Sequence, residues 1–129
     1  LVFEIIPKQK YTSEDLNYGD NDTRATKEQN DKDARPEIAN NIDISNYDII
    51  FIGYPIWWGN TPRIIQTFME NHELNGKTMI PFCTSGSSDI SSSENTLRTY
   101  SGINWISGKR FPSSTSQSEV TNWINSLNY

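Results

Sequence analysis

The segment from Tyr47 to Pro62, which reads YDIIFIGYPIWWGNTP, constrains the fold of this chain more than any other. Its first part, Ile49–Tyr54, is apolar throughout apart from Gly53, as is typical of a parallel strand buried on both faces. A loop with two adjacent tryptophans follows, and Thr61 with Pro62 then resembles a capped helix start. In open α/β sheets, ligands bind where such strands end. The segment therefore predicts an α/β domain with a site at this loop.

Strand and helix signals alternate along the rest of the chain. Leu1–Ile6 is a short apolar run that ends before a proline, and it is predicted to be a strand. Thr23–Asn30 is predicted to form a helix on the surface, because it has little apolar side-chain area to bury, and Pro36–Ile44 a second short helix. Lys77–Thr84 is the second core strand, and Pro81 makes it irregular or places it near an edge.

The C-terminal third contains two capping-box spacings. Ser91 with Glu94 predicts a helix through Tyr100, and Ser116 with Glu119 predicts a final helix. That final helix is amphipathic, with apolar residues at helical spacing: Val120, Trp123, Ile124 and Leu127. Two short strands are predicted between the helices, at Asn104–Ile106 and Lys109–Phe111. The alternation predicts a single three-layer α/β domain over residues 1–129, with a mostly parallel sheet and helices on both faces.

Composition excludes several function classes. The formal net charge is -5, which argues against nucleic acid and anionic membranes as partners. No apolar run approaches the roughly 18–20 residues of a membrane span. The only cysteine is Cys83, so no internal disulfide forms, and a reducing compartment such as the cytoplasm is expected. Apolar residues other than glycine make up 34% of the chain. The usual share, counted with glycine, is about 45–50%, and the seven glycines here do not close the gap. Either the loops are long and polar or a buried element is missing.

Two loops are candidate binding sites. In the first, Trp57 and Trp58 diverge because they are adjacent, so at least one should border a surface cleft and could stack on a planar aromatic ligand. The alternative is that both indoles only pack on the following helix. The second loop, from Cys83 to Asp89, follows the next core strand and should open on the same edge of the sheet. Gly86 permits close backbone approach there. Taken alone, this loop would be interpreted as an ordinary solvated turn, but its placement beside the tryptophan loop favours a binding role.

Other chemistry has little support in the sequence. The start of the helix at Thr61 is a poor phosphate site, because Pro62 removes an amide donor. Cys83 and the single histidine, His72, form no catalytic pair with a third orienting residue, so a buried inert thiol and a surface imidazole are expected. The acidic residues are scattered, and no metal-binding cluster is apparent.

Several motifs together resemble a bacterial branch of the flavodoxin-like proteins. They cover nearly the whole chain in the family's order: Tyr11–Tyr18, Ala34–Pro36, Gly53–Gly59, Gly76–Thr78, Pro81–Gly86 and Gly108–Phe111. The resemblance implies a flavodoxin-like fold that binds flavin mononucleotide (FMN) for electron transfer or for NAD(P)H-dependent reduction. It implies that the isoalloxazine ring lies between two loops, with one tryptophan against it. The first loop consists of Pro55, Ile56, Trp57, Trp58, Gly59 and Asn60, and the second of Thr84, Ser85, Gly86 and Ser87.

One departure from the family pattern leads to further expectations. The family opens with a strand, a phosphate-binding loop of Thr-Gly-Asn-Thr type and a helix, which we expect to be absent here, with Leu1–Ile6 matching the second strand. In the strand order 2-1-3-4-5 the absent strand would lie between Leu1–Ile6 and Ile49–Tyr54. We then expect this chain to form a dimer, to aggregate, or to move Leu1–Ile6 beside Ile49–Tyr54. A second reading is a flavin-free domain that serves as an interaction module or has no activity.

Overall fold

The sheet and its helices follow the predicted α/β pattern. The computed structural model describes residues 1–17 and 19–129, so Tyr18, the last residue of the Tyr11–Tyr18 motif, lies outside the described residues. In the described part, the sheet has four strands, β1 (Ile49–Pro55), β2 (Thr78–Thr84), β3 (Asn104–Trp105) and β4 (Lys109–Phe111). β1 lies along one edge of β2, and β3 and β4 follow one another along the other edge. All of these pairs are parallel, as the sequence predicts.

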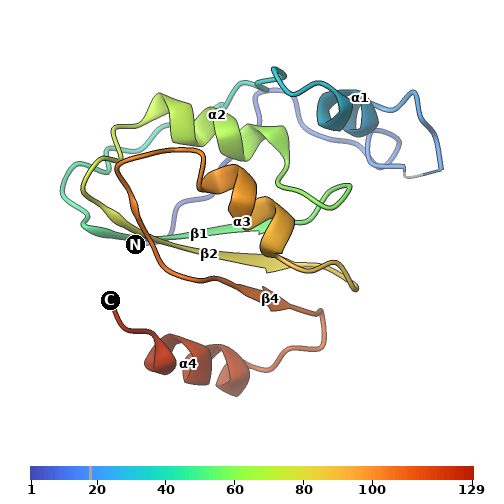
Figure 1. Ribbon diagram of the computed structural model, residues 1–129. Helices are drawn as coiled ribbons and strands as arrows, with labels where there is room; N and C mark the ends of the chain where they lie inside the picture. The colour runs from blue at the N-terminus through green and yellow to red at the C-terminus, as the bar shows by residue number, and fades with distance from the viewer. Residues whose placement is uncertain (18) are drawn as a thin grey trace.

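Helices cover both faces of this sheet. α1 (Arg24–Asn30), α2 (Arg63–Asn71) and α3 (Ser91–Leu97) lie above the sheet in Figure 1, and α4 (Gln117–Ser126) lies below it. The core is on the α2 and α3 side, where Met79 and Cys83 of β2 are fully buried with Leu97 of α3. Burial there also raises the pKa of Tyr54, whose hydroxyl contacts Ser93 Oγ at 2.8 Å.

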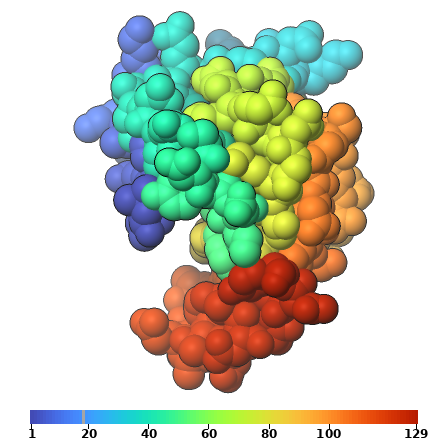
Figure 2. All heavy atoms as spheres, turned by 90° about the vertical axis from the view of Figure 1, so that its left-hand side faces the viewer, coloured from blue at the N-terminus to red at the C-terminus, as the bar shows by residue number. Residues whose placement is uncertain are grey.

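The lower face is held by aromatic contacts with α4. Trp123 meets the rings of Phe51, Phe82 and Phe111 edge-on, at centroid distances of 6.0, 6.3 and 5.4 Å. Ser116 caps α4 as predicted, since Ser116 Oγ accepts a hydrogen bond from the N–H of Glu119 at 3.2 Å. No residue of α4 is buried, and Figure 2 shows the red C-terminal segment apart from the blue N-terminal segment, with an open notch between them.

β3 and β4 lie one after the other along the same edge of β2, and Pro81 explains why they are two short strands rather than one. The N–H of Ile106 donates to the Met79 carbonyl at 3.0 Å, and Pro81 has no N–H with which to continue that ladder. The ladder resumes at Phe82, which pairs with Lys109. The pairing of β2 with β3 and β4 is thus irregular at Pro81, while β2 itself is central and buried, so the first of the two predicted alternatives, an irregular strand or one near an edge, is confirmed.

Several predictions about the first half of the chain were wrong. Leu1–Ile6 is not part of the sheet; it is held instead from its outer side, where the N–H of Ala39 donates to the Ile6 carbonyl at 2.7 Å. It does not lie beside β1 either; an apolar cavity that both segments line lies between them. Pro36–Ile44 is extended rather than helical, with an isolated bridge between Pro7 and Ile38. Helix α1, by contrast, lies at the surface as predicted, since it buries only Ala25 and Thr26 and leaves Lys27 and Asn30 exposed.

Three details of the later elements also differ from prediction. Strand β1 is buried on alternate residues only, because α4 lies mainly under its neighbours and leaves Phe51 38% exposed. Pro62, not Thr61, precedes α2, and no side chain caps that helix. Helix α3 begins at Ser91 itself, so Ser91 is not its cap, and it ends at Leu97. Among the described residues, no helix is both long and apolar enough to cross a bilayer.

Candidate functional site

The two candidate loops lie side by side at the carboxyl edge of the sheet. Pro55, the last residue of β1, pairs with Thr84, the last residue of β2. The pairing continues one step into the loops, since the N–H of Ile56 donates to the Thr84 carbonyl at 3.0 Å. The backbone segments 55–60 and 84–87 therefore start together, which places a possible ligand between them.

The first of these loops is a tight and strained turn. Trp57 and Asn60 exchange two backbone hydrogen bonds, of 2.9 and 3.0 Å, and the two residues between them have left-handed backbone angles. Gly59 has φ 78°, which costs glycine nothing, but Trp58 has φ 50°, which is unusual for a bulky side chain. Strained residues persist where the surroundings hold them and cluster at functional sites, so this turn is the best marker of a site in the chain.

Helix α1 and the segment before it brace the tryptophan turn from one side. The ring of Tyr11 meets the Trp57 ring edge-on at a centroid distance of 5.0 Å. Arg24 lies over the other side of Tyr11, 3.8 Å from its centroid, and its Nε donates to Glu28 at 3.0 Å. Burial, together with the hydrogen bond from its hydroxyl to Glu28, raises the pKa of Tyr11. Tyr11 is therefore a neutral, immobilised support for Trp57.

Gln29, at the end of α1, holds the backbone of the same turn. Its Nε2 donates to the carbonyls of Trp57, at 2.8 Å, and Thr61, at 3.1 Å. Arg63, the first residue of α2, returns the contact by donating to the carbonyls of Glu28 and Gln29. Gln29 Oε1 and Thr61 Oγ1 are buried without a hydrogen-bond partner in the described structure. The hydrogen bonds of Gln29 and Arg63 thus hold the end of α1 against both ends of the turn.

The second loop is held by an arginine on the neighbouring strand. Arg110 of β4 donates from Nε to Ser85 Oγ at 2.9 Å, and from Nη2 to the carbonyls of Ser85, at 3.2 Å, and Gly86, at 2.8 Å. Ser85 Oγ itself donates to the Ser88 carbonyl at 2.5 Å, so this hydroxyl serves the loop's own structure. A side chain added at Gly86 would meet nothing within 4 Å, which means that the open side of this glycine faces free space.

The cysteine beside this loop is unsuited to catalysis. Cys83 is fully buried at the end of β2, and burial raises the pKa of its thiol to about 11. His72, by contrast, is not a surface imidazole, because its ring nitrogens contact the carbonyls of Phe68, at 2.9 Å, and Ile42, at 3.3 Å. No group of three or more His, Cys, Asp or Glu residues that could hold a metal exists in the described part of the chain.

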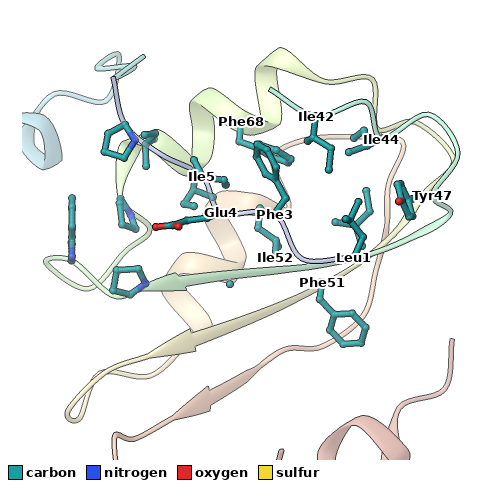
Figure 3. Close-up of a pocket in the computed structure, with 18 of the residues that line it drawn as sticks. Leu1, Phe3, Glu4, Ile5, Ile42, Ile44, Tyr47, Phe51, Ile52 and Phe68 are labelled. Carbon is teal, nitrogen blue, oxygen red and sulfur yellow. The ribbon is translucent and has the colours of Figure 1, made fainter. Parts of the chain in front are cut away.

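A large apolar cavity adjoins the tryptophan turn. Its volume is about 620 Å³, and it lies between Leu1–Pro7, α2 and β1. Figure 3 shows Phe3 and Ile5 on the same side of β1 as Ile52 and Phe68, and Phe51 on the opposite side. Trp57 lines the end of the cavity nearest the turn, so this tryptophan borders a cleft, as expected of at least one of the pair.

Sequence reasoning named both loops but missed the residues that hold them. Tyr11 and Arg110 belong to two motifs of the family resemblance, Tyr11–Tyr18 and Gly108–Phe111, which therefore carried a usable signal. Gln29 belongs to no motif, and its role depends on where α1 packs, which the sequence did not indicate.

Comparison with known proteins agrees with this geometry. A flavodoxin family model matches residues 1–127. A provisionally assigned flavoprotein of Bacteroides uniformis is 45% identical with a TM-score of 0.91, and the match covers 95% of this chain and 80% of that one. A similar protein of Bacteroides eggerthii is 43% identical with a TM-score of 0.88, covering 95% and 78%. A Lactobacillus acidophilus flavoprotein crystallised in complex with FMN is 33% identical with a TM-score of 0.53, covering 74% and 62%.

None of the curated proteins matches the chain. The family model nevertheless spans nearly all of it, and the two Bacteroides structures share its α/β arrangement along 95% of its length. The chain therefore has the flavodoxin-like fold and belongs to the flavodoxin family.

Proposed function

We propose that this chain is an FMN-binding redox protein whose isoalloxazine ring lies between the loops 55–60 and 84–87. The observation that carries the proposal is the strained turn at Trp58 and Gly59, held in place directly beside a second, glycine-containing loop. The flavodoxin family membership and the FMN complex of the Lactobacillus acidophilus relative support the choice of flavin.

The residues present fit the ring of a flavin. The indoles of Trp57 and Trp58 offer stacking surface, and the open side of Gly86 leaves room for a flat ligand against the backbone. The ring, when bound, supplies one- and two-electron redox chemistry. The chain would bind the ring, orient its polar edge toward the amides of loop 84–87, and exclude water with the tryptophan turn.

The phosphate end of FMN has less support. Glu4 contributes the only charged side chain among the described residues that line the cavity next to the turn, and its charge has the wrong sign for a phosphate. Charge-assisted hydrogen bonds contribute about 1.5–3 kcal/mol each, and about 1.4 kcal/mol changes affinity tenfold. We therefore expect this chain to bind the ring with little preference for FMN over riboflavin.

A titration of both flavins tests the proposal. Purified protein should be yellow or become yellow with added flavin, and it should quench the fluorescence of FMN and riboflavin with similar dissociation constants. Gly86→Val, which fills the open side of the loop, should weaken binding of both flavins, whereas Ser101→Val, at an exposed turn before β3, should not. Protein that stays colourless in excess FMN would refute the proposal. Strong selectivity for FMN would refute the expectation about the phosphate.

Two redox roles are compatible with the site. An electron carrier needs only an exposed flavin edge and a redox partner protein, whereas an FMN-dependent oxidoreductase also needs room for NAD(P)H and a substrate. Stopped-flow reduction of the flavin-loaded protein by NADH and NADPH separates the two, since only a reductase is reduced rapidly. The free thiol of Cys83 supports a cytoplasmic site of action for either role.

The alternative function is that of a flavin-free interaction module. The observation that favours it is the apolar cavity beside the edge of β1 that pairs with no other described strand, since an open strand edge can pair with another chain. This reading predicts colourless protein and a stable complex with a protein partner. The same flavin titration therefore decides between the two functions.

A further inference from the structure

Arg110 has an unusual set of partners for a partly buried arginine. Its guanidinium donates three hydrogen bonds to the loop 84–87, and all three acceptors are neutral oxygens, on Ser85 and Gly86. It forms no ion pair within residues 1–17 and 19–129. β4 places it opposite Cys83, the residue just before the loop. An arginine that is not neutralised by a carboxylate here leaves a positive charge behind the loop.

These hydrogen bonds fix the direction of two peptide groups. In a trans peptide, the carbonyl of one residue and the N–H of the next point in opposite directions, and the described chain has no cis peptide. Because the carbonyls of Ser85 and Gly86 point at Arg110, the N–H groups of Gly86 and Ser87 point away from it. Neither N–H has an acceptor among the described residues. Two adjacent donors are thus directed to the side of the loop opposite to the arginine.

We propose that Arg110 is a positioning residue for the flavin site. It turns the Gly86 and Ser87 N–H groups toward the polar edge of the ring, where they donate hydrogen bonds to its carbonyl and nitrogen acceptors. These donors bind the reduced ring, which carries more negative charge, more tightly than the oxidised ring. Arg110 therefore raises both flavin affinity and the reduction potential of the bound flavin. This inference rests on the proposed function.

The test uses three variants of the full chain with riboflavin as the probe. Arg110→Met removes all three hydrogen bonds, Arg110→Lys keeps the charge without the fork of donors, and Lys109→Met removes the neighbouring, exposed positive charge as a control. Circular dichroism and urea unfolding establish that each variant is folded. The measurements are the backbone order parameters of residues 85–88 in flavin-free protein from NMR relaxation, riboflavin affinity, and the midpoint potential of the bound flavin.

Arg110→Met should lower the backbone order parameters of residues 85–88 and weaken riboflavin binding about tenfold, the loss expected for about 1.4 kcal/mol. If the reduced form loses a further tenfold, the midpoint potential falls by about 30 mV for a two-electron couple. Arg110→Lys should show the same loss of order with a smaller fall in potential, and Lys109→Met should behave as the wild type. Arg110→Lys also serves as the test if Arg110→Met fails to fold.

Unchanged order parameters and affinity in Arg110→Met would overturn the proposal. Equal shifts of the potential in Arg110→Met and Lys109→Met would overturn it as well, because they would show an effect of net charge alone. If the wild type binds no flavin, the proposed function fails and the flavin role of Arg110 fails with it. The order parameters still decide in that case whether Arg110 holds the loop, which distinguishes the two failures.

Discussion

Gly108→Ala should be among the most destabilising single-methyl changes in this chain. Gly108 lies between β3 and β4 and packs against Pro81 of the central strand β2. A methyl group there would lie 2.2 Å from the Pro81 carbonyl oxygen, 2.8 Å from its Cγ and 2.9 Å from Cδ1 of Ile90. Pro81 is fully buried between two strands and cannot withdraw, so the backbone at Gly108 has to move instead.

The expected cost follows from two contributions. Forcing a methyl group into a packed interior costs about 1–3 kcal/mol. Moving the backbone also weakens the hydrogen bond from the Gly108 N–H to Glu94 Oε2, which is 2.9 Å long and goes to a charged acceptor, a class that contributes about 1.5–3 kcal/mol. With partial relaxation, the free energy of unfolding should fall by about 3 kcal/mol, and the melting temperature by about 10 °C.

Urea unfolding followed by tryptophan fluorescence and far-UV circular dichroism measures this loss. The matched control is Gly86→Ala, because the added methyl group meets nothing within 4 Å and its effect should stay within about 0.5 kcal/mol. A Gly108→Ala variant that is as stable as the control, with an unchanged dependence on urea, would refute the close contact between Gly108 and Pro81.

Three further predictions concern the thiol, the tryptophan turn and the sheet edge. Burial raises the pKa of the Cys83 thiol from 9.0 to about 11. The neutral thiol therefore stabilises the fold fully below pH 9, and this contribution is lost as the pH rises through 11. The urea concentration at the unfolding midpoint should fall between pH 9 and 11 in the wild type and fall less in Cys83→Ala. Gln29→Leu removes two hydrogen bonds to the tryptophan turn and should cost about 2 kcal/mol, with flavin binding weakened as well; titration curves that overlay those of the wild type would contradict this role. One edge of β1 has no partner strand among the described residues, so the protein should dimerise or aggregate as its concentration rises. Light scattering that shows a monomer at every protein concentration would argue against this prediction.

The sequence predicted those elements that depend on local signals. The chain from Ile49 onward has such signals, and β1, β2, β4 and the Ser116 cap of α4 were predicted at or within one residue of their observed bounds. The two loops of the candidate site were found for the same reason, because each follows a core strand and neighbouring parallel strands end at one edge.

The sequence could not predict features that depend on packing between distant segments. Leu1–Ile6 has the composition of a strand, but no partner strand lies within reach of it, so it remains extended outside the sheet. Pro36–Ile44 is extended because Ile38 and Ala39 pair with the N-terminal segment. The contacts of Gln29 and Arg110 with the site loops join residues 24 or more positions apart, and no local pattern records them.

The exclusively parallel pairing of the described strands has a consequence for how this chain folds. Ile49 pairs with Thr78, and Thr78 with Asn104, so each strand meets its neighbour only after about 26–29 residues of intervening chain have been placed. Among the described residues, no hairpin joins successive strands of the sheet to nucleate it locally. The entropy of closing these long connections has to be overcome before any ladder forms, which slows folding and leaves strand edges open in the meantime. Refolding from denaturant should therefore succeed at low protein concentration and fail increasingly as concentration rises.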